Sequence, residues 1–145
     1  MRGLIQRVRY ARVEVDGELV GAIDQGLLVL LGVERGDSVE RADKLLHKLL
    51  NYRVFQDVGD KMNLSVRDVG GGLLIVSQFT LAADTRKGLR PGFSQAASPS
   101  DAEELYNHVV ARAREQHPIV ASGRFAANMQ ISLLNDGPVT FLLES

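Results

Sequence analysis

Apolar and polar residues alternate through the first part of the chain with the period of two that is typical of β-strands. This alternation predicts strands over residues 4–8 and 11–15, a turn at Asp16-Gly17, and a return strand over residues 18–23. Residues 27–33 are apolar throughout, which is typical of a strand covered on both faces. We therefore expect a hairpin followed by a central strand.

Two later segments have the spacing of amphipathic helices. The first begins after Asp37 or Ser38, with Glu40 placed to form a capping box from Asp37. Its apolar stripe consists of Val39, Ala42, Leu45, Leu46, Leu49 and Leu50. The second is capped by Ser98 and has Pro99 at its first position. Its apolar stripe consists of Ala102, Leu105, Tyr106, Val109 and Ala113. We expect the helices to pack on the sheet.

Two polar segments follow or join strands in the second half of the chain. A buried strand over residues 73–76 runs directly into Ser77-Gln78-Phe79-Thr80. Near the end, strands over residues 128–134 and 139–143 are joined by Asn135-Asp136-Gly137-Pro138. Because functional side chains often follow buried strands, the first segment is a candidate site. The second, judged on its residues alone, is a turn.

The composition is that of one globular domain. Of the 145 residues, 45% are hydrophobic and 24% are charged, which predicts a single domain over residues 1–145. The absence of cysteine leaves neither a disulfide framework nor a thiolate metal site. The first residues carry charge where a signal peptide needs an apolar run, and no stretch has transmembrane length. We expect a cytoplasmic protein with no membrane partner.

The formal net charge of -1 argues against a protein that coats nucleic acid through a broad basic surface. Local basic clusters remain, and each could hold a few phosphates or be a solvated surface. The cluster of Arg86, Lys87 and Arg90 falls in residues 82–97. These residues lack periodicity and predict a long loop of the kind that often covers a site. The two clusters are Arg2, Arg7, Arg9 and Arg12, and Arg86, Lys87 and Arg90.

The usual catalytic motifs are missing. The three histidines are scattered without a metal-binding spacing, so no metal site is expected. The glycine run at residues 70–72 lacks both phosphate-binding patterns. Ser77 has no flanking glycines of a nucleophile elbow, and Thr80 has no adjacent base to activate its hydroxyl group. The chain thus has no obvious acid, base or nucleophile of its own.

Two segments together resemble the signature motifs of the D-aminoacyl-tRNA deacylases. They are Ser77-Gln78-Phe79-Thr80-Leu81 and Asn135-Asp136-Gly137-Pro138-Val139-Thr140. The likeness extends to Gln6-Arg7-Val8 and to residues 88–93 and 123–129, and so covers nearly the whole chain. The resemblance implies a compact α/β fold of two packed, barrel-like mixed sheets with two main helices. It also implies a homodimer with the active site at the subunit interface.

The resemblance further assigns roles to residues. A cis Gly137-Pro138 peptide from one subunit enters the pocket of the other and rejects L-aminoacyl groups, while glycyl-tRNA is admitted. The segment from Ser77 to Thr80 positions the adenosine and the ester at the tRNA acceptor end. The 2'-hydroxyl group of that adenosine assists hydrolysis, and no cofactor is implied. Residues that line or support the pocket are Arg7, Leu81, Phe93, Phe125, Met129, Val139 and Thr140.

Two alternatives remain open from the residues. One is a hydrolase that uses Thr80 as a covalent nucleophile. The other is a non-catalytic module that binds an RNA end. Release of the D-amino acid from charged tRNA separates the second alternative from an enzyme.

Overall fold

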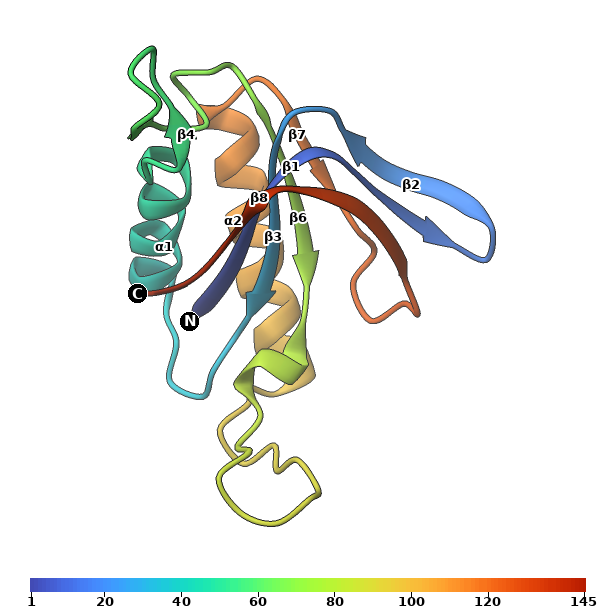
Figure 1. The fold of residues 1–145 in the computed structure, drawn as a ribbon. Helices are drawn as coiled ribbons and strands as arrows, with labels where there is room; N and C mark the ends of the chain where they lie inside the picture. Colours follow the sequence, from blue (N-terminus) through green and yellow to red (C-terminus); the bar gives the residue numbers. More distant parts are fainter.

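The computed structural model describes residues 1–145 and contains eight strands, two α-helices and one 3-10 helix (Figure 1). In chain order these are β1 (Arg2–Val15), β2 (Glu18–Ile23), β3 (Gly26–Gly32), α1 (Val39–Asn51), β4 (Phe55–Gln56), β5 (Met62–Leu64), β6 (Gly72–Ser77), η1 (Phe79–Ala82), α2 (Pro99–Gln116), β7 (Val120–Ser122) and β8 (Gln130–Glu144).

The main sheet is mixed and curls toward a barrel. Its strand order is β2-β1-β3-β6-β7, with β8 paired to β1, and the β3–β6 and β6–β7 pairs are parallel. The two ends of this path approach each other, because a Cβ atom on Gly21 of β2 would lie 2.5 Å from the Ser122 carbonyl oxygen of β7. Strands β4 and β5 form a second, two-stranded sheet. The expected barrel-like α/β domain with two helices is confirmed, although its second sheet is small.

The expected break between strands 4–8 and 11–15 is wrong, because β1 is one continuous strand. It pairs with β8 along nearly its whole length, and the register shifts between Gln6 and Val8 and between Val8 and Tyr10. Bulges at these shifts change which face each side chain meets, so the alternation restarts while the backbone pairing continues. Arg9 and Tyr10 are both exposed for this reason.

The strands expected over residues 128–134 and 139–143 likewise form one element, β8. Gln6 pairs with Thr140 and Val8 with Asn135, so two residue steps of β1 face five steps of β8. The surplus residues loop out of the ladder. The segment around Gly137 is therefore an excursion within a long strand rather than a hairpin turn.

The helices pack on one face of the sheet, as predicted from their apolar stripes, except that Val39 at the start of α1 is 47% exposed and lies outside the buried stripe. The larger core lies between them and β1, β3 and β6, and a smaller cluster fills the opposite face around Val8, Leu28 and Leu74. Both faces of β3 are thus covered, which confirms its expected central place. Neither helix is long and apolar enough to cross a membrane.

The capping of α1 differs from the expected capping box. Ser38 is the N-cap, and its Oγ accepts from the Arg41 amide at 3.3 Å. Asp37 instead has a buried carboxylate that binds the Met1 amino group at 2.7 Å and the Glu34 amide at 2.7 Å. The box is not formed because the Met1 amino group and the Glu34 amide occupy the Asp37 carboxylate. The Ser98 cap of α2 and Pro99 at its start are confirmed.

Candidate active site

A largely apolar cavity of about 470 Å³ opens at the end of β6. The polar segment predicted as a candidate site forms one part of its wall through Ser77, Gln78 and Phe79, and Phe125 and Met129 form another. The remaining lining residues are Val33, Val76, Ala96, Ala97, Pro99, Ala102, Ala126, Ala127 and Ile131. The fold thus brings five of the predicted site residues together in one pocket.

The polar segment is held by its own short-range contacts. The Gln78 amide donates to the Leu31 carbonyl oxygen at 2.8 Å, which continues the pairing of β6 with β3. The Gln78 side-chain amide donates to the Thr80 hydroxyl oxygen. Thr80 is exposed and does not line the cavity. An amide that donates to a hydroxyl group cannot take its proton, and no carboxylate or imidazole group bonds to Thr80.

Phe79 lines this cavity, whereas Phe93 does not line it and packs against Phe79. Phe79 is 60% exposed, and its ring centroid lies 5.2 Å from that of Phe93, which is 40% exposed. Phe79 therefore does not belong to the core. Leu81 does not line the cavity, and its carbonyl oxygen accepts from Arg2 Nη1 at 3.4 Å.

Behind the cavity, Tyr106 of α2 supports Phe125. The two ring centroids are 5.8 Å apart, and the Tyr106 hydroxyl group donates to the Ile75 carbonyl oxygen of β6 at 2.8 Å. Burial raises the pKa of Tyr106 above its ordinary value. The sequence predicts Tyr106 only as a member of the buried stripe of the helix. The one sign of this contact was that a tyrosine, whose hydroxyl group needs a partner, occurs within an apolar stripe.

The second motif, residues 135–140, lies away from this cavity, and several hydrogen bonds hold its turn in place. Arg7 is buried, and its guanidinium group donates to the carbonyl oxygens of Asp136 at 2.8 Å and Val54 at 2.7 Å. Asn135 accepts from the Val139 amide at 2.8 Å and donates to the Thr140 hydroxyl group at 2.9 Å.

Between these anchors, the Gly137-Pro138 peptide bond is cis, and both residues are exposed. Arg7 thus braces the turn, but its second carbonyl partner belongs to the segment after α1 rather than to the turn. The planar guanidinium group of Arg7 thus holds two carbonyl oxygens at once.

The two motifs do not meet within one chain. Ser77 pairs with Leu31 of β3, whereas Arg7, which anchors the second motif, pairs with Leu27. Four strand residues separate these positions, or about 13 Å along the strand direction alone. None of residues 137–140 lines the cavity beside Ser77. One chain therefore holds a pocket and, apart from it, an exposed, braced turn.

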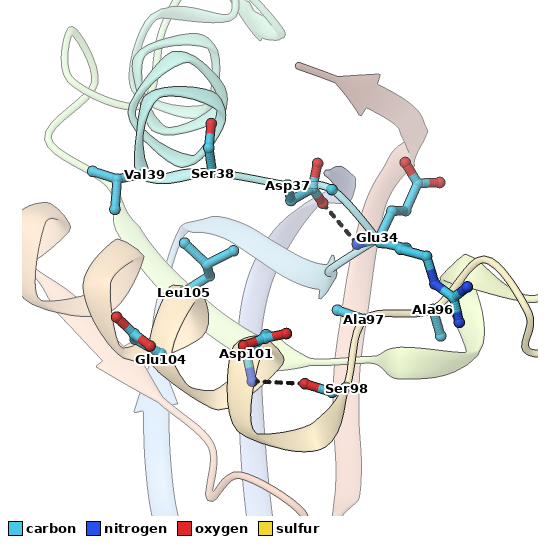
Figure 2. Close-up of a pocket in the computed structure, with 12 residues that line it drawn as sticks. Glu34, Asp37, Ser38, Val39, Ala96, Ala97, Ser98, Asp101, Glu104 and Leu105 are labelled. Carbon is cyan, nitrogen blue, oxygen red and sulfur yellow. Dashed lines mark hydrogen bonds between the residues drawn. The ribbon is translucent and has the colours of Figure 1, made fainter.

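A second cavity of about 470 Å³ lies at the starts of α1 and α2, and Figure 2 shows its lining. Two of its polar side chains cap or brace the chain nearby: Asp37 accepts from the Glu34 amide, and Ser98 accepts from the Asp101 amide at 3.2 Å. None of the predicted site residues lines it. No group of three or more histidine, cysteine, aspartate or glutamate residues is arranged to hold a metal ion.

Comparisons with known proteins agree with these motifs. A family model described as D-Tyr-tRNA(Tyr) deacylase matches residues 4–144. A protein of Stutzerimonas stutzeri (strain A1501) named D-aminoacyl-tRNA deacylase is 74% identical over 145 residues, 100% of both chains. One of Pseudomonas putida (strain GB-1) with the same name is 69% identical over 144 residues, 99% of each chain.

Two solved structures share the fold. One, described as c-Myc DNA Unwinding Element Binding Protein, has a TM-score of 0.95 and 40% identity, and the match covers 100% of this chain and 99% of the other. The other, described as a probable eukaryotic D-amino acid tRNA deacylase, has a TM-score of 0.78 and 18% identity over 99% of this chain and 98% of the other, which shows the fold alone.

The sequence matches define the class of the protein as a deacylase, a hydrolase. The chain belongs to the D-Tyr-tRNA(Tyr) deacylase family.

Proposed function

We propose that this protein hydrolyses the ester between a D-amino acid and the terminal adenosine of tRNA, and so acts as an editing enzyme in the cytoplasm. The observation that supports this most directly is the pocket formed by the first motif in a chain that is 74% identical to a D-aminoacyl-tRNA deacylase over its full length. Water adds to the ester carbonyl carbon, the bond to the ribose oxygen breaks, and that oxygen takes a proton. The products are free tRNA and the D-amino acid.

The geometry of the pocket suits an aminoacylated adenosine. Phe79 at its edge and the neighbouring Phe93 are both exposed, and aromatic rings bind unpaired bases of RNA by stacking. The interior is mostly apolar and large enough for an amino acid side chain. In this proposal the adenine lies on the aromatic pair and the aminoacyl group enters the cavity.

The chemistry is assigned to positioning and to the RNA itself. The cavity lining includes no carboxylate or imidazole group, and Thr80 lacks a base. The vicinal 2'-hydroxyl group of the adenosine is then the nearest group that can assist the attacking water. Ser77 and Gln78 hold the ester in a fixed orientation, and orientation alone can lower a barrier substantially. The contact between Gln78 and Thr80 keeps the segment rigid.

Selection against L-aminoacyl groups is assigned to the exposed Gly137-Pro138 turn of a second subunit. In the L form, the α-carbon carries its side chain where the D form carries hydrogen. A rigid wall on that side therefore rejects every L-aminoacyl group, whatever its side chain is. Main-chain carbonyl groups make such a wall, and the contacts of Arg7 and Asn135 keep it rigid. Glycine has no side chain to reject, so glycyl-tRNA is also a substrate in this proposal.

A homodimer is needed because one chain keeps the turn and the pocket apart. Strand β8 supports it: paired only with β1, it carries exposed apolar side chains at Leu134, Phe141 and Leu142. Long apolar edge strands are normally covered in native proteins. In this proposal a second copy covers β8, and sedimentation of the purified protein measures whether it does.

The test is deacylation of matched D- and L-tyrosyl-tRNA by the purified protein, with free tyrosine released as the readout. We expect rapid release of D-tyrosine and release of L-tyrosine no faster than the spontaneous rate. Equal rates for both hands would contradict the chiral wall. Binding of tRNA without release of either amino acid would instead indicate a non-catalytic RNA-end-binding module.

A further inference from the structure

Beyond the pocket, residues 84–92 form a closed lobe that projects from the body of the protein. The lobe is closed by paired hydrogen bonds between Asp84 and Gly92, at 2.7 and 3.0 Å. Figure 1 shows this yellow segment extending past η1 at one end of the molecule. Residues 85–91 are all exposed, and Leu89 at the tip is fully exposed. The exposure of its side chains leaves them accessible to a partner.

The lobe concentrates positive charge on a chain whose net charge is -1. It holds Arg86, Lys87 and Arg90, and no acidic residue occurs from residue 85 to residue 100. Its one carboxylate, Asp84, binds Arg86 through two contacts of 2.9 and 2.8 Å, and this guanidinium group holds the pKa of Asp84 well below its usual value. Lys87 and Arg90 form no ion pair.

The arginines of the other basic cluster all lie in β1, and each interacts with another residue of the chain. Arg2 pairs with Glu34 at 2.7 Å, and Arg7 is buried against carbonyl oxygens. Arg9 lies 3.6 Å from Asp136, and the guanidinium group of Arg12 lies over the ring of Tyr10. These groups already have partners within the chain. Lys87 and Arg90 do not.

The lobe is also joined to the pocket at both of its ends. It begins directly after η1, and after the lobe Phe93 contacts Phe79 at the edge of the cavity. The following residues are pinned by hydrogen bonds from the Arg35 amide to Gln95 and from the Ala97 amide to Val33, and Ala96 and Ala97 line the cavity. Arg90 is three residues from Phe93, within about 10 Å of it along the chain.

We propose that this basic lobe binds backbone phosphates of the tRNA acceptor arm through Lys87 and Arg90 while the terminal adenosine occupies the pocket. This inference rests on the proposed function, because the pocket sets where the 3' end of the RNA lies. The Arg86–Asp84 pair stabilises the shape of the lobe. Binding by the lobe does not depend on the RNA sequence, because phosphate contacts position an RNA without reading its bases.

The experiment compares two substrates with the double variant Lys87→Ala/Arg90→Ala. One substrate is D-tyrosyl-tRNA and the other is 3'-O-D-tyrosyl-adenosine, which has no phosphate. For the tRNA we expect kcat/KM to fall at least tenfold, mainly through KM, and for the nucleoside to change less than twofold. The matched control is Lys61→Ala/Arg67→Ala, which removes two exposed basic side chains around β5, at the opposite end of the molecule (Figure 1), and changes neither value.

Binding of uncharged tRNA, measured by fluorescence anisotropy over a salt series, tests the lobe independently of catalysis. The double variant should reduce the slope of log K against log salt by about 2, one for each lost phosphate contact. The wild type and the double variant could differ in salt slope as expected while the wild type releases no D-tyrosine. In that case the proposed function fails and the lobe assignment stands. Equal losses on both substrates, no loss on either, or dissociation of the dimer by the variant would each overturn the lobe assignment.

Discussion

Arg7 Nε lies 2.8 Å from the main-chain carbonyl oxygen of Asp136 and donates a hydrogen bond to it from within the sheet. The second donor of the same side chain holds Val54 at 2.7 Å. One buried cation thus connects β1 with the exposed turn of β8 and with the segment after α1. The proposed chiral wall depends on this connection, together with the contacts of Asn135, for its rigidity.

Arg7→Ala should lower the free energy of unfolding by about 2–3 kcal/mol, because it leaves two carbonyl oxygens without their charged donor. It should also reduce the ratio of D to L deacylation rates. Urea denaturation and the two rates measure these effects. Arg9→Ala is the matched control: its side chain is 70% exposed near Asp136, and a surface ion pair of this kind contributes at most about 1 kcal/mol. An unchanged D-to-L ratio in a folded Arg7 variant would contradict the bracing role.

Thr80→Ala should keep substantial deacylation, within about tenfold of the wild type, because orientation of the ester and not a Thr80 nucleophile supplies the rate. A tRNA ending in 2'-deoxyadenosine should instead react at least about a hundredfold more slowly, a loss of the size seen when an acid–base group is removed. Single-turnover release of D-tyrosine measures both. Val58→Ala, at a fully exposed position between β4 and β5, is the control. Complete loss of activity in Thr80→Ala with unchanged fold and tRNA binding would revive the covalent nucleophile.

Gly137→Ala should raise L-tyrosyl-tRNA deacylation relative to the D rate, by about tenfold. Gly137 has φ +149°, and an added Cβ atom would lie 2.6 Å from Val139 Cγ2 and 3.3 Å from Arg7 Nη2, so the turn must shift. A displaced wall no longer fills the space that an L side chain needs. Gly17→Ala, at a positive-φ glycine in the β1–β2 turn with open space around it, is the control. A correctly folded dimer of the Gly137 variant that shows no L activity would count against exclusion.

Tyr106→Phe should lower the free energy of unfolding by about 1 kcal/mol at neutral pH, through loss of the hydrogen bond to Ile75. The wild-type protein should also lose stability as the pH rises beyond about 10, because the buried hydroxyl group has a raised pKa and the unfolded chain loses its proton first. This alkaline loss should be smaller in Tyr106→Phe. Denaturation across the pH series measures it, with Tyr10→Phe, at 40% exposure, as the control. Identical alkaline slopes for wild type and Tyr106→Phe would contradict the assignment.

Several features of the fold were predictable because they depend on neighbours in the chain. The stripe from Ala42 to Leu50 and the apolar run of β3 each record which faces are buried. The Ser98 cap and the polar segment after β6 are local in the same sense. The motif at Ser77 was therefore found, together with its place at the end of a strand.

Other features depend on partners that are distant in sequence. The continuity of β1 and β8 follows from their pairing with each other, and bulges disguise it in the alternation. Asp37 binds the Met1 amino group, 36 residues away, instead of capping α1 as a box. The contact of Tyr106 with Phe125 and its bond to Ile75 likewise have no local signature.

By itself, the sequence determined both helices, most of the strand positions and the two segments that carry the motifs, because periodicity, caps and turns act over a few residues. Only the tertiary structure decided that Ser77 and Met129 face one cavity while Arg7 turns away from it to hold Asp136. Those relationships depend on strand register and on the curl of the sheet. Register is set by the packing of the whole domain, and a shift of one residue would send every side chain of a strand to the other face.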